Sequence, residues 1–233
     1  GGCPWDRAQT HRSLMPYLLE EASEALEALE EGDQERLCEE LGDLLLEVLL
    51  QVQIAEELGE FTLTDVVRGI AGKLVRRHPH VFGDDKLETA EQVVEQWEEL
   101  KGEERADASA LAGVPATLPA LAGAQALQRR SHRAGFRWPS VDDAWRKLEE
   151  ELAELSRAQT PAQREEEVGD ALFALCDLAR WLEVDAELAL RRTNRTFQGR
   201  FQAMESRLRG EEREMAALPL AELLALWRET KGQ

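Results

Sequence analysis

Two segments of this chain carry carboxylates at spacings that suit metal binding. The first reads Glu-Glu-Ala-Ser-Glu over residues 20–24 and is followed by Glu-Leu-Gly-Asp over residues 40–43. The second reads Glu-Glu-Leu-Ala-Glu over residues 150–154 and is followed by Glu-Val-Gly-Asp over residues 167–170. Residues three or four apart share one face of a helix. If the two helices of each pair pack antiparallel, four carboxylates meet at one place, and oxygen ligands without His or Cys suit Mg²⁺ or Mn²⁺.

Such a cluster is unfavourable unless protons or cations neutralise it. Two like charges about 4 Å apart repel by roughly 4 kcal/mol at an effective dielectric near 20. With 47 acidic residues among 233, one such motif is expected by chance and would mark a solvated helix face. Two copies favour a site instead, because each has the same second motif and is followed by a largely apolar segment, at 44–50 and 171–178. We expect these helices and their acids to be buried.

The overall composition limits the partners and the compartment. The net charge of −19 would repel nucleic-acid phosphates and argues against a nucleic-acid partner. No apolar run is long enough to cross a membrane, and no signal peptide opens the chain. The cysteines Cys3, Cys38 and Cys176 are scattered and odd in number, which is typical of reduced thiols. We therefore expect a cytoplasmic protein without a membrane partner.

Strand signals are nearly absent, so the pattern predicts an all-α protein. The predicted helices begin or end at capping and breaking residues. They cover residues 11–31, 33–59, 64 or 65 to 78, 89 onward, 118–134, 140 onward, 160 onward, 185–209 and 219–231.

Landmarks of the first half recur in order in the second half, which indicates an internal repeat. Gly-x-x-Trp occurs at 2–5 and 135–138, the acidic motifs follow, and Trp-x-x-x-Lys occurs at 97–101 and 227–231. We expect two tandem domains, 1–108 and 124–233, joined by a linker over 109–123. The second half has a helix before its Gly-x-x-Trp, whereas the chain opens at the first copy. The first domain is therefore expected to lack its first helix.

These strings resemble the MazG family of nucleoside triphosphate pyrophosphohydrolases over essentially the whole chain. The resemblance rests on both acidic motifs and on residues 2–6, 73–82 and 135–138. It implies two tandem helical bundle domains whose four-helix core is completed by dimerisation, so that the protein is a homodimer. It also implies hydrolysis of a nucleoside triphosphate to the monophosphate and pyrophosphate with Mg²⁺, for which Mn²⁺ could substitute. The role would be nucleotide housecleaning or control of nucleotide signals.

The resemblance implies roles for individual residues. The metal ligands would be Glu151, Glu154, Glu167 and Asp170 in the second half and Glu21, Glu24, Glu40 and Asp43 in the first. The catalytic set adds Glu150, with Glu20 at the matching place, as supporting acids or candidate bases. Substrate binding would fall to Arg192, Asn194, Arg200, Trp227 and Lys231, and in the first half to Lys73, Arg77, Trp97 and Lys101. For each Trp, base stacking and core packing stay open as alternatives.

Both halves depart from the family pattern of Asn, any residue, Lys and an aromatic residue. Thr196 replaces the Lys in the second half, and Ala71 replaces the Asn in the first. Family precedent and the remaining residues favour the second half as the main catalyst. Asp177, two turns after Asp170, is a candidate either for a hydrogen bond to a substrate sugar or for an ion pair with Arg180.

Two other classes of protein use acidic helices. One is a metal-binding interaction or regulatory protein without turnover, which pyrophosphate release from a nucleotide would distinguish. The other is a di-iron carboxylate bundle, which needs Glu-x-x-His pairs that neither motif contains. The sequence does not indicate the preferred base and sugar.

Overall fold

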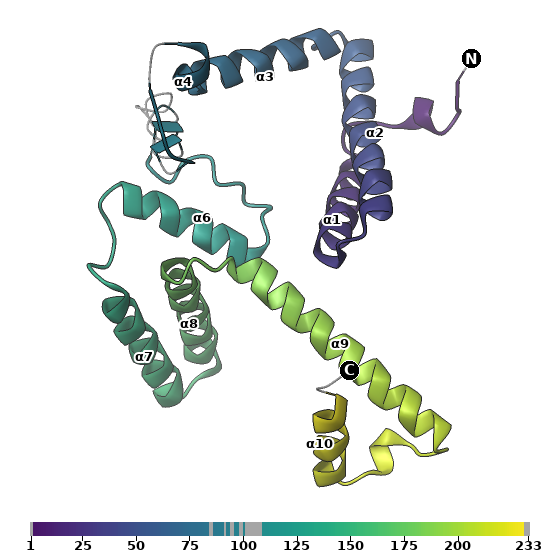
Figure 1. Cartoon of the computed structure of the whole chain (residues 1–233), viewed down its shortest axis with the longest axis vertical. Helices are drawn as coiled ribbons and strands as arrows, with labels where there is room; N and C mark the ends of the chain where they lie inside the picture. The colour runs from purple at the N-terminus through teal and green to yellow at the C-terminus, as the bar shows by residue number, and fades with distance from the viewer. Residues whose placement is uncertain are drawn as a thin grey trace. The chain divides into compact units, whose positions relative to one another are not determined.

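The computed structural model describes residues 2–83, 86–90, 92–93, 96–97, 100 and 109–230. The regular structure of these residues is entirely helical (Figure 1), which confirms the all-α prediction. The chain divides into two compact units, Gly1–Ala106 and Asp107–Gln233, and each is described by itself. In the described part of the chain, no helix combines the length and apolar character that crossing a bilayer would require.

The first unit is built on a hairpin of two long helices. Its elements are a 3-10 turn η1 (Asp6–Ala8) and the helices α1 (Met15–Glu31), α2 (Gln34–Leu58), α3 (Leu63–Arg77) and α4 (Pro79–Phe82). Helices α1 and α2 lie side by side (Figure 1) because the chain reverses within two residues. Gly32 ends α1 with a left-handed φ of 72°, and Asp33 caps α2 by accepting from the backbone N–H groups of Glu35 and Arg36.

Helix α3 begins earlier than predicted. The N-cap is Thr62, whose side chain accepts from the backbone N–H of Asp65, while the Asp65 carboxylate accepts from the backbone N–H of Thr62. The prediction of a start at Thr64 or Asp65 was therefore wrong, because Asp65 is the third helical residue of this capping box rather than its cap. The predicted stop at His78 is confirmed, since α3 ends at Arg77.

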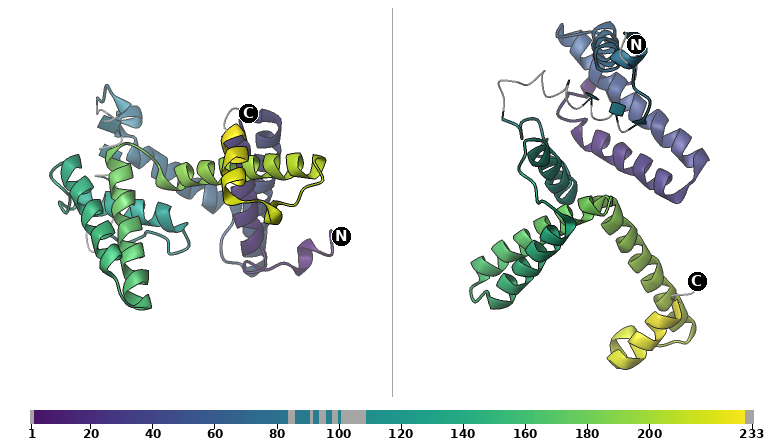
Figure 2. Two further views of the ribbon diagram at one scale, coloured as in Figure 1. Left: turned by 90° about the horizontal axis from the view of Figure 1, so that it is seen from below. Right: turned by 60° about the vertical axis from the view of Figure 1, so that its left-hand side comes forward.

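The second unit contains a second hairpin of the same kind. Its elements are α6 (Ala120–Arg133), α7 (Val141–Arg157), α8 (Pro161–Trp181), α9 (Ala186–Gly210), a 3-10 turn η2 (Met215–Ala217) and α10 (Leu220–Glu229). The predicted cap Ser140 is found, and Thr160 and Asp185, where helices were predicted to begin, are caps as well. Each accepts a hydrogen bond from a backbone N–H of its helix. Helices α7 and α8 pack side by side, whereas α9 leads away from them and carries α10 against its far end (Figure 2).

The predicted linker over 109–123 overlaps a helix. In the sequence, the first unit ends at Ala106 and the second begins at Asp107, and α6 starts at Ala120. The last four residues of the predicted linker therefore belong to the second unit's first helix.

A buried glutamine ties α6 to the ends of α8 and α9. The amide nitrogen of Gln125 donates to the carbonyls of Cys176 and Val184, at 3.2 and 3.0 Å, and its oxygen accepts from the backbone N–H of Ala186 at 3.1 Å. Its side chain thus bonds backbone groups of α8 and of the turn between α8 and α9. This contact fixes α6 against α8, where the cavity described below forms.

The apolar segments after the acidic motifs are buried only in part in the single chain. The prediction that they are buried is confirmed for residues such as Ala174 and Leu178 on α8 and wrong for others. On α2, Leu45 and Leu46 are 57% and 52% exposed, and on α8, Leu172 is 46% exposed. Each hairpin has only two helices, so one face of each helix packs on its partner and another is left uncovered. Each hairpin thus presents an apolar surface, which we define by Leu41, Leu45 and Leu49 on α2 and by Val168, Leu172 and Leu175 on α8.

Candidate metal centre and substrate cavity

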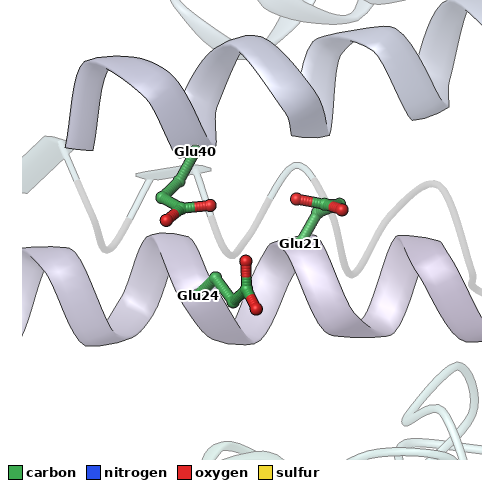
Figure 3. A group of neighbouring side chains, drawn as sticks. All are labelled: Glu21, Glu24 and Glu40. Carbon is green, nitrogen blue, oxygen red and sulfur yellow. The ribbon is translucent and has the colours of Figure 1, made fainter. Parts of the chain in front are cut away.

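Three carboxylates converge in the first hairpin. Glu21 and Glu24 project from α1 and Glu40 from α2 towards the space between the helices (Figure 3). One oxygen atom of each lies within 4.8 Å of the other two. Asp43, the fourth predicted ligand, is outside this group, but its charge is close enough to help raise the pKa of Glu21. The predicted convergence of acids is thus found for three of the four.

The second hairpin contains two overlapping groups of the same size. Glu151 on α7 meets Glu167 and Asp170 on α8, with one oxygen of each within 4.8 Å of the others. Glu151 also lies within that distance of Glu150 and Glu154 on its own helix. All five acids predicted to be catalytic in the second half are therefore near one another, with Glu151 common to both groups. Glu151 is buried, whereas Asp170 and Glu154 are exposed.

The electrostatics of both clusters favour an added cation. Burial, followed by the charges of neighbouring acids, raises the pKa of Glu21 and of Glu167, and the charge of Glu40 raises the pKa of Glu24. One oxygen of Glu167, Oε2, is buried and accepts no hydrogen bond from the described residues. A buried carboxylate oxygen without a partner is costly, and oxygen-only ligands suit a hard divalent cation. The residues present therefore fit a metal ion.

Each cluster already contains a basic side chain that the sequence analysis missed. In the first hairpin, Arg36 Nε donates to Glu40 Oε1 at 3.2 Å. In the second, Lys147 Nζ lies 2.8 Å from Glu150 Oε1 and 2.6 Å from Glu151 Oε1. The signal was the spacing of four residues that separates Arg36 from Glu40 and Lys147 from Glu151. It is hard to recognise in a chain where charged residues make up 32% of the sequence.

A cavity of about 550 Å³ opens beside the acids of the second hairpin. Its wall combines α6, the loop after it, α7 and α8, so it depends on the packing of α6 against the hairpin. The wall includes aromatic residues, basic residues and acids, namely Phe136, Trp138, Phe173, Arg137, Lys147, Glu151, Asp170 and Asp177. An apolar hollow with a few charged groups is the usual form of a small-molecule site.

None of the predicted substrate-binding residues that the structure describes lines this cavity. Arg200 lies over the ring of Trp227, 3.8 Å from its centroid, and donates to the Trp227 carbonyl, so these two pair with each other where α9 meets α10. In the first unit, Arg77 lies 5.9 Å from the ring centroid of Trp97. The same pairing in both units is consistent with the predicted repeat. Arg192 and Asn194 are exposed on α9 and Lys73 is exposed on α3, whereas Lys101 and Lys231 lie outside the described residues.

The acidic clusters predict stabilisation by divalent cations. At one hundred times its dissociation constant, an ion that binds only the folded state adds about 2.7 kcal/mol of stability. We expect millimolar Mg²⁺ to raise the melting temperature above that in a chelator, and Asp170→Asn and Asp43→Asn each to remove part of the increase. Glu165→Gln, an exposed acid on α8 outside the cluster, is the matched control. Identical melting curves with Mg²⁺ and with the chelator would contradict preformed sites.

Comparison with known proteins finds similarity to the first hairpin and to nearly the whole chain. The model of the MazG nucleotide pyrophosphohydrolase domain matches residues 9–82, which contain the first hairpin. A Thermotoga maritima protein named nucleoside triphosphate pyrophosphohydrolase/pyrophosphatase MazG is 42% identical over 99% of this chain and 90% of its own length. The Escherichia coli K12 nucleoside triphosphate pyrophosphohydrolase is 41% identical over 100% of this chain and 91% of its own length. These similarities extend through both hairpins, and the chain belongs to the MazG family of nucleotide pyrophosphohydrolases.

Proposed function

We propose that the chain hydrolyses nucleoside triphosphates to nucleoside monophosphates and pyrophosphate, in nucleotide housecleaning or control of nucleotide signals. The observation that carries this proposal is the position of Glu151 and Asp170, which belong both to the acidic cluster and to the wall of the cavity. A nucleoside in the cavity would have its phosphates beside the acids. The names of the relatives support the same reaction.

The ion proposed for the cluster is Mg²⁺, with Mn²⁺ as a substitute, held by Glu151, Glu154, Glu167 and Asp170. When bound there, it neutralises charge on phosphate oxygens and acidifies water. Lys147 and Arg137 line the same cavity and can bind phosphate oxygens. In the reaction, a water oxygen forms a bond to the α phosphorus, the bond to the bridging oxygen breaks, and pyrophosphate leaves. Glu150, exposed beside the cluster, is the candidate acceptor for the water proton.

We also propose that both units are MazG-like domains and that two copies of the chain associate. The two hairpins support a tandem repeat, since each carries its acids on two consecutive, packed helices. The exposed apolar surfaces on α2 and α8 support a homodimer, in which hairpins of two copies would complete a four-helix core. Arg192, Asn194, Arg200 and Trp227 remain proposed substrate-binding residues, as do Lys73, Arg77 and Trp97. The cytoplasm is the proposed location, since Cys3, Cys38 and Cys176 are all free thiols.

The products of the reaction test the proposed chemistry. We expect Mg²⁺-dependent formation of monophosphate and pyrophosphate from at least one member of a panel of ribo- and deoxyribonucleoside triphosphates. Chromatography of the nucleotide products together with pyrophosphate detection measures both. Release of a diphosphate and inorganic phosphate would refute cleavage between the α and β phosphates. No turnover across the panel would favour a metal-binding regulatory protein.

The apolar surfaces predict a dimer in solution. Burying side chains such as Leu45 and Leu172 removes apolar area from water, worth about 25 cal/mol per Å². Light scattering at micromolar concentration is expected to give twice the mass of one chain. Leu172→Glu should shift the mass towards that of a single chain, whereas Leu220→Glu, at the start of α10 and 69% exposed, should not. A single-chain mass for the unaltered protein would exclude the dimer.

A pair of matched substitutions tests which unit catalyses. The cavity and Lys147 support the second unit, so we expect Glu154→Gln to lower turnover at saturating Mg²⁺ by at least about 10- to 100-fold, the loss typical even of groups that only support metal ligands. Glu24 holds the matching place in the first hairpin, so Glu24→Gln is expected to have a small effect on turnover. Steady-state rates of both variants, with melting temperatures to confirm folding, give the comparison. Loss of turnover in Glu24→Gln alone would reverse the assignment.

A further inference from the structure

Two buried side-chain oxygen atoms of residues that line the cavity have no hydrogen-bond donor among the described residues. They are Oε1 of Gln128 on α6 and Oδ2 of Asp177 on α8. The two residues are only 4% and 6% exposed, and neither oxygen accepts a hydrogen bond from the described part of the chain. Leaving a buried acceptor unsatisfied is unfavourable, so such atoms in a folded protein need an explanation.

Each unpaired atom is held in place by the other half of its own side chain. Gln128 Nε2 donates to the backbone carbonyl of Phe173 at 2.7 Å, which identifies the amide oxygen as the free end. Asp177 Oδ1 accepts from Arg180 Nε at 3.1 Å and lies 3.2 Å from His132 Nε2. Neither side chain can turn its free oxygen towards a new protein donor without breaking these contacts. The two acceptors are therefore fixed features of the wall.

His132 contacts Oδ1 of Asp177 and not the unpaired Oδ2. A guanidinium nitrogen of Arg180 lies 3.1 Å from His132 Nε2, and arginine can only donate. Nε2 thus faces a donor, on Arg180, and an acceptor, Oδ1 of Asp177, and in either tautomer its contact with Asp177 is made to Oδ1. Burial, and then the charge of Arg180, lower the pKa of His132, which favours the neutral ring. Arg180 thus serves both neighbours, and Oδ2 of Asp177 is left for a group that enters the cavity.

The distance along α8 relates these acceptors to the acidic cluster. Asp177 follows Asp170 by two turns, and a rise of 1.5 Å per residue separates their Cα atoms by about 10 Å. Asp170 belongs to the cluster that would lie beside the phosphates. The same wall therefore presents metal-binding acids at one end and two hydrogen-bond acceptors further along, where the nucleoside of a bound nucleotide would extend.

We propose that Gln128 and Asp177 determine nucleotide specificity by accepting hydrogen bonds from N–H or O–H groups of the nucleoside. This inference rests on the proposed function. The donors are either sugar hydroxyls or the amino or ring N–H groups of the base. A site built to hydrogen-bond such a group rejects an analogue that lacks it, because the buried acceptor is then left unpaired.

The first hairpin lacks this device at the matching position. Leu50 follows Asp43 by the same seven residues that separate Asp177 from Asp170. A leucine side chain offers no acceptor, so recognition of nucleoside donors through this position is a property of the second unit alone.

The test pairs one substitution with substrates that each lack one donor. The substrate preferred by the full-length, Mg²⁺-loaded protein is compared with its 2′-deoxy or 3′-deoxy form and with a form lacking the amino or ring N–H group of the base. We expect one analogue to raise KM by about 10- to 100-fold, the loss typical of a hydrogen bond to a charged group. Asp177→Asn, which replaces an acceptor with a donor, should raise KM for the preferred substrate similarly. For the analogue that lacks the donor, Asp177→Asn should change KM by no more than about twofold relative to the unaltered chain. The substitution and the missing donor remove the same hydrogen bond, so their effects do not add.

The identity of that analogue distinguishes a sugar hydroxyl from a base donor. Gln128→Met, which removes the second acceptor, should likewise affect KM more than kcat. A melting temperature in Mg²⁺ close to that of the unaltered chain confirms folding of each variant. Should Asp177→Asn fail to fold, the analogue series on the unaltered chain remains decisive, and equal KM values throughout would overturn the proposal in favour of a bound water only. The proposal would also be overturned if Asp177→Asn raised KM equally for the preferred substrate and for every analogue.

If the proposed function itself is wrong, the experiment gives a different result. In that case the unaltered chain hydrolyses no triphosphate in the panel. The inference is then tested by calorimetry, with α,β-imido triphosphates of the same nucleosides as the probes. Binding that weakens when one donor is removed supports the acceptors, and binding that is absent or indifferent to every donor refutes them.

Discussion

Repulsion between carboxylates that face each other across a two-helix hairpin is the constraint on which each unit depends. The short turns at Gly32 and at Thr160 hold the hairpins closed, and closure brings Glu40 towards Glu24 and Glu167 towards Glu151. The molecule offsets the repulsion by protonation that burial favours, by a basic side chain from one of the two helices, and by capacity for a divalent cation. The first two are features of the folded chain itself, whereas the third links the site to its chemistry.

The parts of this fold set by neighbouring residues were predictable from the sequence. Caps at Asp33, Ser140 and Thr160 follow from side chains that bond the backbone two or three residues on, so their signal is local. The start of α3 was missed because Thr62 and Asp65 both have capping character, and only their reciprocal bonds distinguish cap from third residue. The apolar content of α2 and α8 predicted that they are buried. Burial depends on which other element packs against a helix, and the local sequence does not determine that element.

As with the fold, the parts of the candidate site that depend on local spacing could be predicted from the sequence. Spacing alone indicated which acids share a helix face, and three of four meet in the first hairpin. Lys147 and Arg36 were not found, since an acidic surface also carries many basic residues at helical spacing. The cavity could not be predicted, because it requires α6 to be placed against α8 by contacts such as those of Gln125, between residues far apart in sequence. The free oxygens of Gln128 and Asp177 emerge only once that packing is known.

The basic side chain inside each acidic cluster separates assembly of the site from its loading. Lys147 bridges Glu150 and Glu151, and Arg36 joins Glu40 to Glu27 and Glu31. An internal counter-charge lets the hairpin close in the absence of any ion, so the fold need not wait for one to be supplied. It also means that carboxylates of these clusters would have to release an ammonium or guanidinium group in order to hold a cation. Such a release would weaken the hold on a cation, and it would leave the ammonium group of Lys147 free for an anionic ligand.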